Sequence, residues 1–169
     1  MKKSCILLLS LSFMFLGCTS IPKETISFPA VNEMKPFDYE TGEVSVSINY
    51  VNESVIADQV TTLLNTVFSK NIENKNDENI IYIDFNVVQR SFIQNINQKN
   101  TIYINVIGYD SDNNIVLRDN FYLTGDDTFI SSVIQYKCVN KITKKLLNYQ
   151  NSVNEAYIKR IKNAEKENK

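Results

Sequence analysis

Residues 79–94 read NIIYIDFNVVQRSFIQ, and residues 101–109 read TIYINVIGY. In both stretches apolar side chains recur at every second position, which is the period of a β-strand with one buried face. The buried faces would be formed by Ile81, Ile83, Phe85 and Val87 in the first stretch and by Ile102, Ile104 and Val106 in the second. The segment between them contains the short polar run NINQKN, so we predict a β-hairpin with this run near its tip.

Two more strands are predicted around this hairpin. Residues 43–51 (EVSVSINYV) alternate strictly, and one face would carry Val44, Val46, Ile48 and Tyr50. The run DSDNN at 110–114 has the composition of a turn, and it leads to a strand at residues 115–124. Asp119 breaks the apolar parity of that strand, so we expect a bulge or a sheet edge there.

Two helices are predicted as well. Asn52 is a candidate N-cap for the first, whose apolar side chains recur at helical spacing up to about residue 71. The second would follow Gly125, with Asp126 or Asp127 as its N-cap. Its apolar stripe consists of Phe129, Ile130, Val133, Ile134, Val139, Ile142, Leu146 and Leu147, and the period continues to Ile161. Cys138 lies on this stripe and is predicted to be a buried structural thiol.

The predicted order is β-α-β-β-β-α. It indicates an α+β, two-layer sandwich, in which two helices pack on one face of a four-stranded, mainly antiparallel sheet. A helix that continued to Ile161 would outrun such a sheet, so we expect the last 20 residues to project, kink or fray.

The N-terminus has the pattern of a processing signal. Lys2 and Lys3 precede an apolar run of about 12 residues, which is too short to span a membrane. The run ends in Leu16-Gly17-Cys18, which resembles a bacterial lipobox, although Phe15 and Leu16 depart from its usual residues. The resemblance implies a diacylglyceryl group on Cys18 and cleavage before it. Thr19 is not the Asp that resembles an inner-membrane retention signal, which favours the periplasmic face of the outer membrane.

These features predict four parts of the chain: a signal peptide at 1–17, a lipidated N-terminus and tether at 18–42, a domain at 43–149, and a basic helical extension at 150–169. The tether holds all three prolines, and Phe28 and Phe37 within it are candidates for local docking. Residues 19–136 carry 7 Lys/Arg and 16 Asp/Glu, whereas residues 137–169 carry 9 and 3. The basic end is either a solvated helix face or an electrostatic contact with anionic lipid, an acidic partner or the domain itself.

Several chemistries are excluded by composition. The chain has no histidine, so it cannot form a Ser-His-Asp site or a usual catalytic zinc site. Its few glycines cannot form a phosphate-binding loop. The DSDNN run lacks the glycine of a calcium loop, and a helix cap explains Asp126 and Asp127 more simply than an acid/base pair does. We therefore predict no enzyme activity, no metal and no cofactor.

The hairpin tip is the candidate binding surface. Phe92, Ile93 and Ile96 are large apolar residues near the predicted turn, where a protein partner would use them better than the core would, with Arg90 at the polar rim. The alternative is that Phe92 and Ile93 fold under a neighbouring loop.

A lipobox, a proline-containing tether and this element order resemble small bacterial envelope lipoproteins, namely the LptE-like lipopolysaccharide-assembly lipoproteins and the auxiliary lipoproteins of lipid-trafficking ABC transporters. The resemblance is one of architecture over about residues 43–148, without a shared side-chain motif. It implies a non-catalytic envelope adaptor with a protein partner, anchored to the membrane through acyl chains on Cys18 and separated from nucleic acid. The alternative is a lipoprotein that holds a lipid or small ligand between helices and sheet.

Replacement of Cys18 tests the membrane anchor. Cys18→Ala is expected to release the protein into the soluble envelope fraction or to stall it as precursor, because only a thiol can form the thioether to diacylglycerol. The measurement is fractionation of cells, together with mass spectrometry of the wild-type N-terminus. A mature N-terminus that is unacylated and begins at another residue would show that the predicted lipidation and localisation are wrong.

Overall fold

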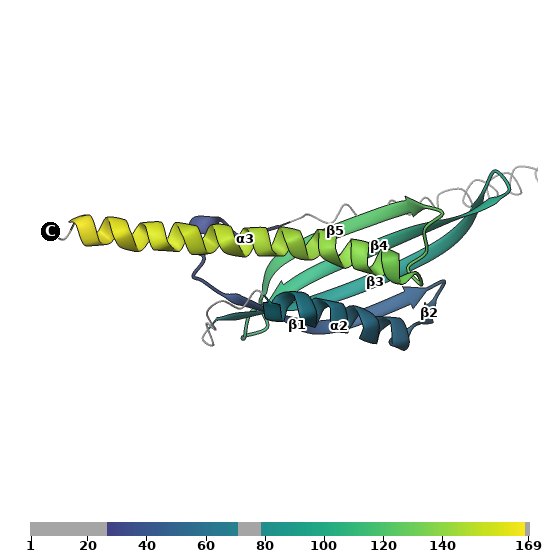
Figure 1. Cartoon of the computed structure of the whole chain (residues 1–169), viewed down its shortest axis with the longest axis horizontal. Coiled ribbons are helices and arrows are strands. Elements are labelled where there is room, and N and C mark those ends of the chain that lie inside the picture. The colour runs from purple at the N-terminus through teal and green to yellow at the C-terminus, as the bar shows by residue number, and fades with distance from the viewer. Residues whose placement is uncertain (1–26, 71–78, 168–169) are drawn as a thin grey trace, which may run out of the picture.

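A computed structural model describes residues 27–70 and 79–167 of the chain. The predicted signal peptide and Cys18 therefore lie outside the described residues. The elements are η2 (Val31–Glu33), β1 (Asp38–Ile48), β2 (Val51–Asn52), α2 (Ser54–Lys70), β3 (Ile80–Gln94), β4 (Asn97–Tyr109), β5 (Ile115–Gly125) and α3 (Ser132–Glu167). The predicted α+β class is confirmed, since two helices pack against a sheet and lie on the same side of it (Figure 1). No helix in the described ranges is long and apolar enough to cross a membrane.

The sheet differs from the prediction in strand number and direction. Its order is β2-β1-β3-β4-β5, and β1 runs parallel to β3 while the other neighbours are antiparallel. Four strands were predicted and five are present, because the two-residue strand β2 was not predicted. The parallel pair follows from connectivity, because α2 carries the chain from the end of β1 back to the start of β3.

The hairpin of β3 and β4 is longer than predicted. Its ladder runs from Tyr82↔Tyr109 to Gln94↔Asn97, so only Asn95 and Ile96 remain in the turn. Most of the polar run NINQKN is thus strand, because backbone pairing continues beyond the part of the sheet that the helices cover.

The core lies between the helices and the sheet, where the predicted alternation is confirmed. The buried apolar residues include Ile56, Val60, Leu64 and Phe68 of α2, Ile81, Ile83, Phe85 and Val87 of β3, Ile102, Ile104 and Val106 of β4, and Ile134, Cys138, Val139, Ile142, Leu146 and Val153 of α3. Full burial of one such Val, Leu, Ile or Phe side chain is worth about 1.5–3 kcal/mol. The helix layer and the sheet are therefore held together by apolar packing. The apolar stripes of the helices pack on the odd-numbered residues of β3 and the even-numbered residues of β4.

The domain begins earlier than residue 43. β1 starts at Asp38, and Phe37 is only 1% exposed, so residues 38–42 belong to the sheet and not to a tether. Ser27 and Arg118 exchange two backbone hydrogen bonds of 3.0 and 2.8 Å, which pair Ser27 with strand β5. The predicted local docking of Phe28 is also observed, since its ring lies edge-on to Tyr149 with centroids 4.9 Å apart.

Strand β1 also ends earlier than expected. Tyr50 was predicted to share the buried face of Val46 and Ile48, but it lies in the turn between β1 and β2 and is 83% exposed. Asn49 and Tyr50 have φ values of 49° and 73°, which place both in the left-handed region of a two-residue hairpin turn. The apolar alternation of the sequence continues to Tyr50, but strand β1 ends at Ile48 because this turn follows it.

Helix α3 begins at Ser132, so neither Asp126 nor Asp127 is its N-cap. Phe129 and Ile130 lie in the loop before the helix, where Phe129 is buried and Ile130 is exposed. The helix then runs for 36 residues, roughly 54 Å, and its last turns project beyond the sheet (Figure 1). Arg160 ties the projecting part to η2 by donating to the backbone carbonyls of Asn32 and Met34.

A bulge or a sheet edge was predicted at Asp119, and the residue lies on the edge strand β5. The ladder to β4 continues through Asp119, and its only irregularity lies further along, between Gly108 and Tyr109. The Asp119 carboxylate is buried and accepts a hydrogen bond from Lys145 Nζ of α3 at 2.7 Å. The polar residue that interrupts the apolar parity of β5 therefore joins the sheet to the helix layer.

Cys138 tests the packing of α3. Its side chain is buried, and burial raises the pKa of the thiol to about 11. Cys138→Ala is expected to lower the free energy of unfolding by about 1 kcal/mol, because it leaves a small cavity. Thiol labelling of Cys138, followed by peptide mass spectrometry, should be slow in the folded protein and fast in denaturant. Equal labelling rates in the two states would contradict the burial.

Candidate functional site

Most exposed large hydrophobic residues of the described chain lie at one end of the sheet. This is the right-hand end in Figure 1, where β1 and β3 end and both helices begin. We define the turn-end surface as the exposed apolar residues there: Tyr50, Val51, Val55, Phe92, Ile93, Ile96, Ile130 and Val133. They come from the corner between β1 and α2, from the β3–β4 hairpin, and from the loop and first turn of α3.

The predicted tip residues belong to this surface. Phe92, Ile93 and Ile96 are 39%, 81% and 97% exposed, so the alternative that Phe92 and Ile93 fold under a neighbouring loop is wrong. Phe92 and Ile93 are consecutive in a strand, so their side chains lie on opposite faces of the hairpin. Ile96 occupies the turn between them and β4. The hairpin end is therefore apolar on both faces and at its tip.

Arg90 lies beside this tip and faces a second loop. Its guanidinium carbon is 3.8 Å from the centroid of the Tyr50 ring, and one of its nitrogens donates to the Gln89 carbonyl at 3.0 Å. A cation stacked on an aromatic ring in this way is worth about 0.5–1 kcal/mol at an exposed site. The prediction missed Tyr50 because it assigned this residue to the core; Asn49 was the signal, since asparagine favours left-handed turn positions.

A buried amide joins the hairpin to the loop before α3. Gln89 Oε1 accepts a hydrogen bond from the backbone N–H of Phe129 at 2.7 Å, and Gln89 Nε2 donates to Asn100 Oδ1 at 3.4 Å and to Thr128 Oγ1 at 3.2 Å. Gln89 and Asn100 are both buried. They lie on the face that is apolar further along the same strands, so the core ends in a polar cluster here.

The same cluster continues to the turn between β1 and β2. Ser91 Oγ donates to Asn100 Oδ1 at 2.7 Å, and the Asn49 amide exchanges two hydrogen bonds with Ser91 at 2.8 and 3.0 Å. Three loops that carry exposed apolar residues are thus connected by one network, which we call the Gln89 network. Sequence periodicity did not reveal it, because the alternation of β3 and β4 predicts which face a residue occupies but not which polar groups meet across loops.

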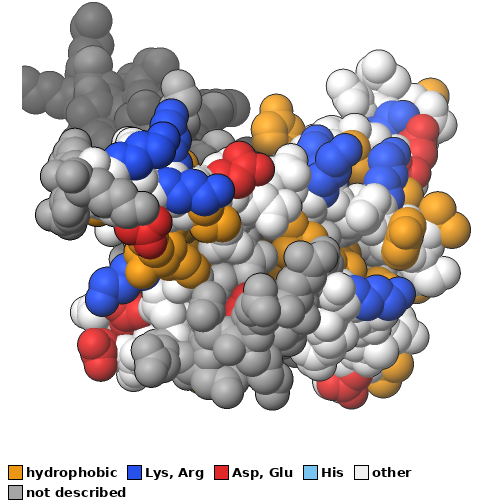
Figure 2. Space-filling view, turned by 60° about the vertical axis from the view of Figure 1, so that its left-hand side comes forward, with side chains coloured by type: hydrophobic (Ala, Val, Ile, Leu, Met, Phe, Trp, Pro, Cys, Tyr) orange, Lys and Arg blue, Asp and Glu red, His pale blue; other side chains and the backbone are white. Residues whose placement is uncertain are grey.

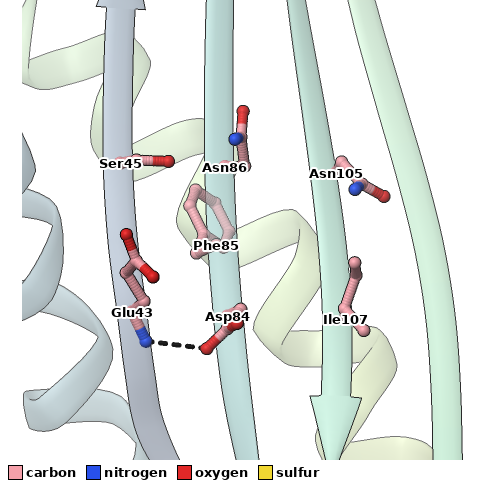
Figure 3. A pocket seen from close by; sticks show the side chains of 7 residues that line it. All are labelled: Glu43, Ser45, Asp84, Phe85, Asn86, Asn105 and Ile107. Carbon is pink, nitrogen blue, oxygen red and sulfur yellow. Dashed lines mark hydrogen bonds between the residues drawn. The ribbon is translucent and has the colours of Figure 1, made fainter. Parts of the chain in front are cut away.

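A small polar hollow lies on the open face of the sheet, away from the helices. It has a volume of about 150 Å³ and is lined by Glu43, Ser45, Asp84, Phe85, Asn86, Asn105 and Ile107 (Figure 3). Asp84 Oδ1 accepts a hydrogen bond from the backbone N–H of Glu43 at 2.7 Å. This bond closes a β-bulge between Thr41 and Val44, where a Cβ on Gly42 would collide with the Asp84 carboxylate. The bulge therefore accounts for the hollow, since Glu43 and Asp84, which line the hollow, are the residues that the bulge brings together.

A second hollow of about 410 Å³ lies along the projecting turns of α3, between Glu155 and Lys166. Lys159, Lys162 and Lys166 line it together with Ile158. Figure 2 faces this end of the molecule and shows the basic side chains in separate groups, with acidic and hydrophobic side chains between them. The basic side chains visible on this face thus do not form one continuous cationic patch.

The remaining acidic candidates have structural roles. Asp126 is ion-paired with Lys99 at 2.8 Å, and the Asp110 carboxylate accepts backbone hydrogen bonds from Asp112 and Asn114. Hydrogen bonds from the side chain and backbone of Asn114 hold the pKa of Asp110 below its usual range. The predicted turn at 110–114 is confirmed. Within the described ranges, no three Cys, Asp or Glu side chains gather in a group that could hold a metal ion.

Comparison with known proteins gives one structural likeness to report. No protein-family model matches the sequence, and no curated protein matches it. Among solved structures, the chain is similar to a neuraminyllactose-binding hemagglutinin homologue from Helicobacter pylori, with a TM-score of 0.43 and 12% identity over 70% of this chain and 89% of that one. This degree of likeness does not carry a functional argument, so function is inferred from the residues of this chain.

The Gln89 network is tested by Gln89→Leu. The substitution leaves the buried N–H of Phe129 without its acceptor, which is expected to lower the free energy of unfolding by about 1–3 kcal/mol. Hydrogen exchange of the Phe129 amide should accelerate. Gln59→Leu, at an exposed position of α2, is the control and should change stability little. Equal effects of the two substitutions would show that the network does not hold the loops.

Proposed function

We propose that this protein is a membrane-anchored lipoprotein of the bacterial cell envelope that acts as a non-catalytic adaptor or auxiliary subunit of a transport or envelope-assembly machine. The observation that carries the proposal is the turn-end surface, where three parts of the chain with eight exposed apolar residues lie at the same end of the sheet. Apolar area in water is unfavourable by roughly 25 cal/mol per Å², so a surface of this kind favours a protein partner that covers it.

Attachment to the membrane rests on the sequence Leu16-Gly17-Cys18 after the short apolar run. Acyl chains on Cys18 would hold the protein at the envelope, and Thr19 favours the periplasmic face of the outer membrane. A partner for the turn-end surface would then be another envelope protein, because nucleic acid is absent from that compartment. The proposal includes no catalytic residue, metal or cofactor.

The packing between the layers favours an adaptor over a lipoprotein that holds a ligand there. Val60 of α2, Phe85 of β3 and Leu146 of α3 all meet in that space and are fully buried. Two hollows lined by described residues lie elsewhere, on the open face of the sheet and along the end of α3. A ligand between helices and sheet would have to displace these side chains.

Docking is tested by the double variant Phe92→Ser with Ile93→Ser. It should lower the melting temperature much less than a core substitution, because Ile93 is 81% and Phe92 39% exposed, and it should abolish co-purification of the partner from mildly cross-linked membranes. Ile115→Ser is the matched control, since Ile115 is an exposed apolar residue at the opposite end of β5, and it should retain the partner. A large drop in melting temperature with the partner retained would refute docking through the tip.

A further inference from the structure

The end of the β3–β4 hairpin extends beyond the rest of the sheet as a two-stranded ribbon. Gln89 and Asn100 are the last buried residues of their strands, and three residue pairs and a turn follow them. This ribbon is roughly 10 Å long at the usual rise of a β-strand. Its only charged residue is Lys99 at the base, which is ion-paired with Asp126 at 2.8 Å, and residues 92–98 carry no charge. The outer part of the ribbon is therefore uncharged and exposed, and the ribbon is connected to the body at one end.

We infer that this ribbon is a wedge that enters a cleft in a protein partner, with Ile96 as its leading side chain. The inference rests on the proposed function and names the shape and chemistry of the partner. Phe92 faces the open side of the sheet and Ile93 faces the helix side, so a partner that lay flat against one face would leave the other in water. Only a partner that surrounds the ribbon covers Phe92, Ile93 and Ile96 together.

The backbone at Ile96 supports a binding role for this side chain. Its φ is 71°, in the left-handed region, where a β-branched residue is strongly disfavoured because Cβ crowds the neighbouring carbonyl. The preferred sequence for a two-residue turn of this kind is Asn-Gly, and Asn95 already supplies the first residue. Ile96 is also 97% exposed, so its side chain gives the isolated protein no packing in return. A strained residue without internal contacts indicates an external one.

The polar residues of the ribbon distinguish a protein cleft from a lipid bilayer. Gln94, Asn95, Asn97 and Gln98 lie at the same level as the apolar tip residues and are exposed. Insertion into hydrocarbon would leave these amide groups without hydrogen-bond partners, at a high cost. A protein cleft offers backbone and side-chain groups to pair with them. The Gln89 network fixes the base of the ribbon, which lowers the entropy lost on binding.

The first test places a photo-crosslinking amino acid at position 92, 93 or 96 of the full-length protein in the producing bacterium. The expected result is one protease-sensitive adduct of the same mass from all three positions and none from position 115. An adduct from position 92 or 93 alone would overturn the wedge while leaving docking intact. No adduct from any of the three positions would overturn the proposed docking itself.

The second test measures the melting temperature of Ile96→Gly together with formation of that adduct from position 92. Relief of the left-handed residue should raise the melting temperature by about 3 °C, and the adduct should be lost. Asn95→Gly is the control, because it loosens the same turn but keeps Ile96, and it should retain the adduct. An unchanged or lower melting temperature in Ile96→Gly, or an adduct that persists, would overturn the role of Ile96.

Two further measurements address other occupants of the same surface. The full-length Cys18→Ala protein is mixed with vesicles of phosphatidylethanolamine and phosphatidylglycerol, and its self-association is followed by sedimentation. We expect no vesicle binding that depends on Ile96 and no dimer formation that depends on Ile96. Vesicle binding that Ile96→Gly abolishes would make the ribbon a lipid-binding element, and Ile96-dependent dimers would make the occupant a second copy of this chain; either result would overturn the inference.

Discussion

The antiparallel pairing of β3 with β4 determines which side chains of this protein lie inside and which lie outside. The ladder continues without a register shift from Tyr82↔Tyr109 to Gln94↔Asn97. A slip of one residue would turn Phe85 and Val106 toward solvent, so the buried faces of both strands hold the register in place. The same pairing continues past the last core residues, and it therefore also builds the ribbon that carries Phe92, Ile93 and Ile96. Core and candidate binding surface are two parts of a single ladder.

Periodicity was sufficient to predict the elements whose burial is regular. Ile81, Ile83 and Phe85 alternate, Ile56, Val60 and Leu64 recur at helical spacing, and both patterns correspond to the observed strand and helix. The errors occur where another interaction decides the structure. Tyr50 continues an alternation that a left-handed turn at Asn49 ends, and β2 exists only because that turn brings Val51 back to Ile48. The direction of β1 relative to β3 depends on the crossover through α2, which no local pattern encodes.

The candidate site was predictable in its apolar part but not in its polar support. Exposure of Phe92, Ile93 and Ile96 follows from their position beyond the core, and this can be recognised from the sequence. The Gln89 network could not be recognised, because the hydrogen bonds that join its three segments connect distant residues: Asn49 bonds Ser91 across 42 positions, and Gln89 bonds Phe129 across 40. Polar residues such as Asp119, which joins β5 to Lys145 of α3, look like interruptions in a sequence and act as connections in the fold.

The backbone pairing of Ser27 with Arg118 would limit how far the domain could lie from an anchor at Cys18. Cys18 precedes Ser27 by nine residues, and a fully extended chain of that length spans roughly 30 Å. An acyl group on Cys18 would therefore keep Arg118 of the edge strand β5 within about that distance of the lipid surface, much less than a free tether ending at residue 42 would allow. A connection this short would keep that part of the domain beside the membrane and raise its effective concentration toward a membrane-bound partner.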